Sequence, residues 1–208
     1  ALDAPAQQAA YKEMAQVAHD GLGAPDRAAT YLAMGLAAGD DDAELLAALV
    51  LYHIEREEWN VALDYGRRLD AVGGPPAELA HEVHQQLAAA ALNGNEREAA
   101  RLHLRRALEA APEDEELRQR LERLLVEDGE HTTLRRLILD RASREEGAAR
   151  AISLARAAQL SADELDDDAE AERLFTEALQ ADPDADAIRD RFIALLRKRE
   201  RWSALFEE

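Results

Sequence analysis

The sequence predicts an all-α protein made of helices of moderate length, and three observations lead to this prediction. Apolar residues recur at the helical spacings i, i+3, i+4 and i+7, as at Leu117, Leu121, Leu124 and Leu125. Residues that favour strands are sparse, and alternation with period two is nearly absent. All six prolines fall between the helical stretches, where a missing N–H costs least. We therefore expect eleven helices and the start of a twelfth, each of about 13 to 17 residues.

Composition and charge exclude several classes of protein. The 208 residues carry 25 basic and 44 acidic side chains, and the resulting net charge of −19 argues against nucleic acid or anionic lipid as the main partner. A hydrophobic fraction of 47% is too high for a disordered chain. No stretch is apolar for long enough to insert into a membrane. The absence of cysteine excludes disulfides, thiol catalysis and thiolate metal sites.

The helices form a repeat when they are aligned. Residues 98–114 and 169–184 share a small residue, a large apolar residue, an Ala-Leu pair and an end marked by proline and acidic residues. The equivalent small or apolar position recurs every 34 to 38 residues, at Ala28, Ala62, Ala100, Leu134, Ala171 and Leu205. A period of about 35 residues with two helices indicates stacked helical hairpins. The expected units are residues 6–40, 41–76, 77–112, 113–143, 144–183 and a truncated 184–208.

These units resemble the tetratricopeptide repeat (TPR) family, whose repeat has about 34 residues. The resemblance covers nearly the whole chain, as five repeats and a truncated sixth, and the arginine-rich, acidic composition is typical of a bacterial array. It implies a right-handed α-solenoid, forming a single domain in a fragment of a longer protein. The residues that match the repeat are Tyr11, Met14, Ala15, Ala28, Leu32, Trp59, Ala62, Leu87, Ala88, Ala100, Leu104, Ala107, Pro112, Ala171, Phe175, Ala178, Pro183, Trp202 and Leu205.

Two units depart from the family's pattern. The fourth has Arg118 and Glu122 where the family packs apolar or small residues. The fifth has a hairpin lengthened by the acidic run of residues 163–168. That run resembles a calcium loop only in charge, because it lacks the required glycine and glutamate. We expect its aspartates to cap the following helix.

The histidines raise the question of a metal site. His81 and His84 lie at i, i+3 on one predicted helix, and His103 lies on the next. Zinc would need further ligands, and no motif in the sequence supplies them. The sequence therefore favours packed histidines, and we expect neither a metal nor another cofactor. It also contains no nucleophile elbow, P-loop or dinucleotide fingerprint, and we expect no enzymatic activity.

The TPR resemblance also implies a concave groove, formed by the first helix of each hairpin, that binds a peptide. Across the matched groove positions four basic residues face two acidic ones, Glu127 and Asp190, although the chain as a whole is strongly acidic. One interpretation is that amide and guanidinium groups hold a partner segment bearing acidic residues. The other is that the groove is simply polar. The candidate binding residues are Lys12, Gln16, Gln85, Asn93, Gln119, Arg123, Arg156 and Arg197.

The expected function is that of a non-catalytic scaffold that binds a partner protein or peptide. One alternative is a regulatory or assembly segment of a larger multidomain protein or membrane-associated machine. Another is self-association, because an uncapped terminal repeat exposes apolar surface to a second copy. We expect a cytoplasmic location, no nucleic-acid partner and no direct membrane insertion.

Overall fold

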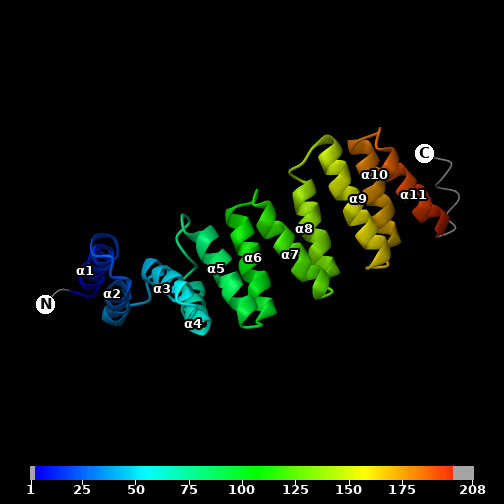
Figure 1. Cartoon of the computed structure of the whole chain (residues 1–208). Helices are drawn as coiled ribbons and strands as arrows, with labels where there is room; N and C mark the ends of the chain where they lie inside the picture. Colours follow the sequence, from blue (N-terminus) through cyan, green and yellow to red (C-terminus); the bar gives the residue numbers. More distant parts are fainter. Residues whose placement is uncertain (1–2, 199–208) are drawn as a thin grey trace. The chain divides into compact units, whose positions relative to one another are not determined.

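A computed structural model of the chain describes residues 3–198, which contain helices and connecting turns but no strand (Figure 1). The chain divides into two compact units, the first ending at Leu124 and the second beginning at Leu125. Among the described residues, no helix combines the length and the apolar character needed to cross a membrane.

Eleven α-helices lie within the described residues, as the sequence predicts, and the expected twelfth falls outside them together with Trp202 and Leu205. The boundary between the units lies inside α7. The helices of the first unit, ending with α7, are α1 (Ala4–Gln16), α2 (Pro25–Ala38), α3 (Ala43–Glu55), α4 (Trp59–Ala71), α5 (Ala80–Asn93), α6 (Arg97–Ala110) and α7 (Glu115–Glu127). Those of the second are α8 (His131–Ala142), α9 (Gly147–Asp163), α10 (Asp168–Ala181) and α11 (Asp186–Lys198).

Aspartates cap the N-termini of several of these helices, where their side chains accept hydrogen bonds from backbone amides. Asp3 accepts from the amide of Ala6, and Asp42 accepts from the amides of Glu44 and Leu45 at 3.0 and 3.1 Å. Asp167 accepts from the amide of Glu170 at 3.3 Å, so the predicted capping role of the acidic run in the fifth hairpin is correct. Such caps satisfy amide donors that have no partner inside the helix.

One local feature was not predicted from the sequence. A π-helix, η1 (Val17–Gly21), continues directly from α1. The amide of Leu22 bonds the carbonyl of Val17 at 3.2 Å, closing a turn that is one residue wider than an α-helical turn. This wider turn accompanies the packing of Ala18, which is 1% exposed, against Ala15 and Ala28.

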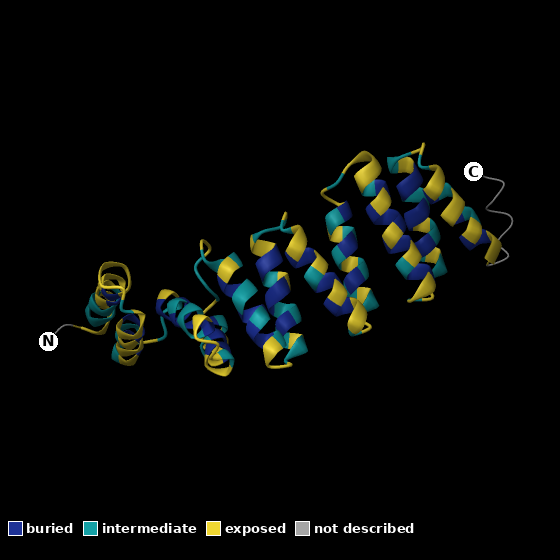
Figure 2. Ribbon diagram, viewed as in Figure 1, coloured by how far each residue is buried: buried dark blue, intermediate teal, exposed yellow. Residues whose placement is uncertain are grey.

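Consecutive helices pack as hairpins, which confirms the predicted fold class. In the first unit α1 packs on α2, α3 on α4 and α5 on α6, and in the second α9 packs on α10. Neighbouring hairpins also contact each other, α2 against α3 and α4 against α5. Figure 2 shows the buried residues gathered on the inner faces of these helices. Small residues with no exposed surface occupy the predicted repeat positions Ala62, Ala100, Ala107, Ala171 and Ala178.

A glycine brings α4 and α5 especially close together. A Cβ atom built on Gly66 would lie 2.6 Å from the Cδ2 atom of Leu87, which is fully buried. Real Cβ atoms do not approach another atom so closely, so the contact between the second and third hairpins depends on the missing side chain.

The polar residues of the predicted fourth repeat are buried within α7. Arg118 is 5% exposed, and its guanidinium donates to the carbonyl of Pro112 and to Glu115, the latter at 3.3 Å. Glu122 is 8% exposed. A buried guanidinium needs hydrogen-bond partners, and Arg118 finds them in the first turn of α7 and in the turn before it, although its Nη1 atom is buried without one.

The buried alanines yield the first testable prediction. Replacing Ala100, which has no exposed surface on α6, with leucine should destabilise the protein by roughly 1–3 kcal/mol, because there is no space for three further carbon atoms. The measurement is the free energy of unfolding in urea. The matched control is Ala33→Leu on the exposed face of α2, which should change that free energy by less than about 0.5 kcal/mol. Equal effects of the two substitutions would contradict close packing at Ala100.

Candidate functional site

A cavity of about 490 Å³ lies between α1, α2 and α3 in the first unit. Its walls are mostly apolar, because small residues on α1 and α2 leave space beside the leucines of α3. Two predicted binding residues of α1, Lys12 and Gln16, line it. Leu51 and Tyr52 of α3 also line it. The other members of its apolar lining include Ala15, Ala28, Ala29, Leu32, Leu45 and Ala48.

Lys12 is already engaged in ion pairs at this cavity. Its ammonium nitrogen lies 2.9 Å from a carboxylate oxygen of Asp42 and 2.7 Å from one of Glu44. Burial opposes the charged form of Lys12, but the hydrogen bonds to Glu44 and Asp42 outweigh burial and raise the pKa of the ammonium group. Lys12 was predicted to meet a partner's carboxylate, whereas in the structure it meets two carboxylates of its own chain.

The rim of the cavity is acidic. Asp20, Glu44 and Glu55 line it, against the single positive charge of Lys12. The predicted excess of basic residues therefore does not hold at this place, because acidic residues outside the predicted groove positions also reach the rim. A partner segment that combines apolar and basic residues would complement these charges better than an acidic one.

The structure places the remaining predicted binding residues on four further helices. Gln85 is half-buried on α5, and Asn93 is exposed at the end of that helix. Gln119 and Arg123 are exposed on α7, where the amide of Gln119 donates to Glu115 at 3.3 Å. In the second unit Arg156 and Arg197 are exposed on α9 and α11, two helices that contact each other.

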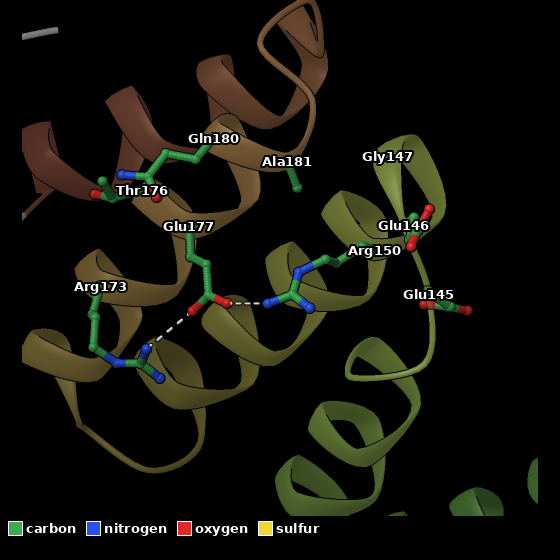
Figure 3. A pocket seen from close by; sticks show the side chains of 9 residues that line it. All are labelled: Glu145, Glu146, Gly147, Arg150, Arg173, Thr176, Glu177, Gln180 and Ala181. Atoms are coloured by element: carbon green, nitrogen blue, oxygen red, sulfur yellow. Dashed lines mark hydrogen bonds and ion pairs between the residues drawn. The ribbon is translucent and has the colours of Figure 1, made fainter.

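A second pocket, in the second unit, has charged walls that were not predicted from the sequence (Figure 3). It lies between the start of α9 and the face of α10, and Glu177 stands between two arginines. The carboxylate of Glu177 accepts hydrogen bonds from Arg150 and from Arg173, the latter at 3.0 Å. Arg173 also donates to Glu170, and this contact raises the pKa of the guanidinium. These charges are paired with one another and join α9 to α10.

A cluster of two histidines and one aspartate lies where α4, α5 and α6 meet. His84 and His103 are each 5% exposed, with their Nδ1 atoms 3.2 Å apart and their rings stacked at 5.3 Å. One ligand atom from each of Asp70, His84 and His103 lies within 4.8 Å of the other two. We call these three residues the histidine cluster.

Burial controls the protonation of the histidine cluster. It lowers the pKa of both imidazoles, and the positive charge of Arg106 lowers them further, while Asp70 acts in the opposite direction. Glu109 also opposes the shift at His84. Both rings are therefore neutral at pH 7, so that one Nδ1 atom donates to the other.

Only part of this cluster was predicted from the sequence. His84 and His103 were considered there together with His81, but His81 bonds Asp114 instead, at 3.1 Å. Asp70, which lies on α4 in the preceding hairpin, was not predicted. No motif or repeat position in the sequence links Asp70 to His84; their proximity follows from the packing of α4 against α5.

Comparisons with known proteins support the fold and go no further. No protein-family model matches the chain, and no curated protein is similar to it in sequence. Among solved structures, MamA aligns with a TM-score of 0.50 and 17% identity over 84% of this chain and 91% of its own. YrrB, described as a TPR protein with an unusual peptide-binding site, aligns with a TM-score of 0.51 and 15% identity over 87% of this chain and 89% of its own.

The helical hairpins and these structural similarities define the class of the protein, which is an all-α helical-repeat protein. Its fold is that of the TPR proteins, as the sequence predicts.

Asp42 yields a second testable prediction, which concerns pH. Burial opposes its ionisation, but hydrogen bonds from the amides of Leu45 and Glu44 and from Lys12 hold the pKa of its carboxyl below the ordinary value of 3.8. A lowered pKa in the folded state stabilises the protein above the unfolded pKa, and this stabilisation is lost as the pH falls through the lower, folded value. Asp42→Ala should therefore cost about 1–2 kcal/mol at pH 7 and progressively less below about pH 4.

The measurement is the free energy of unfolding of both proteins between pH 7 and pH 3. Asp40→Asn, two residues earlier and exposed, is the matched control and should change this free energy by less than about 0.5 kcal/mol. A cost of Asp42→Ala that does not vary with pH would show that the carboxylate charge contributes nothing.

Proposed function

We propose that the chain is a non-catalytic scaffold that binds a segment of a partner protein. The cavity between α1, α2 and α3 is the observation that carries this proposal. It has apolar walls, a charged rim and two of the residues expected from the TPR groove, Lys12 and Gln16. Stacked hairpins hold these side chains in place before binding, so a partner meets a surface that costs little to order.

YrrB, which shares the fold, is described as having a peptide-binding site, and this supports the same class of function. In this chain the proposed contacts also include Gln85, Asn93, Gln119, Arg123, Arg156 and Arg197. The alternatives of an assembly segment and of self-association stay predictions.

The charge of the cavity suggests the chemistry of the segment that it takes. We propose an apolar side chain as the anchor, because Leu32, Leu45 and Leu51 can cover it. A neighbouring lysine or arginine of the partner would face Asp20, Glu44 and Glu55. Peptides selected from a random library on the full chain should therefore combine apolar and basic residues.

A third prediction tests the cavity directly. Leu51→Glu should raise the dissociation constant of a selected peptide at least about tenfold, because the substitution places a carboxylate among the apolar walls of the cavity. The matched control is Val61→Glu, an equivalent change at an exposed apolar residue of α4 outside the cavity lining. The measurement is the dissociation constant of the labelled peptide by fluorescence anisotropy, with helicity checked by circular dichroism. Equal binding by both variants would place the site elsewhere.

A fourth prediction tests the expected preference for acidic residues in the second unit. Arg156 and Arg197 are exposed on α9 and α11, and we expect them to bind carboxylates of a partner. The double variant Arg156→Glu, Arg197→Glu should weaken the binding of an acidic peptide about tenfold at low salt. The effect should shrink as added salt screens the charges.

The control for this charge reversal is Arg136→Glu, a similar change at an exposed arginine of α8. Binding should be measured for acidic peptides and for the same sequences with amides in place of the carboxylates. If Arg136→Glu weakens binding as much as the double variant, the effect belongs to total charge and the surface at Arg156 and Arg197 is not the site.

A further inference from the structure

The histidine cluster joins two successive hairpins in the core of the first unit. Asp70 belongs to α4 of the second hairpin, and His84 and His103 belong to α5 and α6 of the third. Two imidazoles occupy buried positions in a chain whose core is otherwise made mainly of alanine and leucine.

The spacing of the cluster suits a tetrahedral metal ion. Zinc–nitrogen bonds of about 2.0–2.1 Å in a tetrahedral site place two nitrogen ligands about 3.3 Å apart. The Nδ1 atoms of His84 and His103 are 3.2 Å apart, and ligand atoms of all three residues lie within 4.8 Å of one another.

The chemistry of the cluster also suits such an ion. Imidazole nitrogen and carboxylate oxygen are both ligands that zinc takes in proteins, and the cluster offers two of the first and one of the second. Arg106 donates to the Oδ1 atom of Asp70 and so orients this carboxylate beside the two imidazoles. The side chain of Asp70 is 22% exposed, which gives an ion and a water ligand a way in from solvent.

We propose that Asp70, His84 and His103 bind a divalent transition-metal ion of the zinc class. The two Nδ1 atoms and one carboxylate oxygen are the protein ligands, and water is the fourth. Two nitrogen ligands favour zinc, cobalt or nickel over magnesium and calcium, which prefer oxygen. The ion links the second hairpin to the third and stabilises the folded state, because the unfolded chain does not hold these ligands together. This inference does not depend on the proposed partner binding.

The test uses the full chain without a histidine tag, first dialysed against a chelator. Cobalt(II) is the probe, because its visible absorption reports the number and geometry of its ligands, and zinc should displace it. We expect one ion per chain, an absorption spectrum typical of tetrahedral cobalt with nitrogen ligands, and an unfolding temperature that rises with added zinc but not with magnesium. Failure of the wild-type chain to take up cobalt or zinc saturably would overturn the proposal and leave a hydrogen-bonded pair of neutral histidines.

Variants identify the ligands. His84→Gln and His103→Gln should each abolish the cobalt spectrum. Asp70→Asn should lower the affinity for zinc at least tenfold (about 1.4 kcal/mol). The matched control is His81→Gln, one turn before His84 on the same helix but bonded to Asp114. It should bind as the wild type does. Uptake that survives His84→Gln, or that is lost equally in His81→Gln, would place any metal outside this cluster, and circular dichroism confirms that each variant is folded.

Discussion

The close approach of neighbouring helices is the constraint on which the rest of this structure depends. Helices can pack this closely only where side chains are small, and the buried alanines at positions such as 62, 100 and 107 meet that need. Gly66 goes further, since even a methyl group there would meet Leu87. Because the helices are held at such short distances, cavities and polar clusters between them have defined geometry. The cavity at α1, α2 and α3 and the histidine cluster both arise at such helix junctions.

Much of the fold could be predicted from the sequence, because it depends on features that recur. The repeated positions of Ala62, Ala100 and Ala171 and the prolines between helices specify hairpins without knowledge of any distant contact. Asp70 could not be predicted as a neighbour of His84, since the two lie in different hairpins and no repeat position links them. The widened turn of η1 was missed for a similar reason: it reflects packing of Ala18 against another helix, which no local pattern records.

Charge was harder to predict than fold. Counting the expected groove positions suggested a surface with an excess of basic residues. In the structure many of the basic side chains meet acidic ones of the same chain, as Lys12 meets Asp42 and Glu44, and Arg150 and Arg173 meet Glu177. In a chain with 44 acidic residues a basic side chain seldom lacks a carboxylate within reach. The free charge of a surface therefore depends on pairing across helices, which spacing along one helix does not reveal.

The π-helix η1 gives the first hairpin an unusual sensitivity to length. Its residues His19 and Asp20 line the cavity at the point where the wide turn brings them to the rim. Each residue of an α-helix advances about 100° around the axis, so the loss of one residue from this turn would point the following side chains in another direction. Related chains could in this way change the chemistry of the rim by a single insertion or deletion while every residue of the cavity wall stays the same. Length, as well as residue type, is then a means by which such repeats acquire new partners.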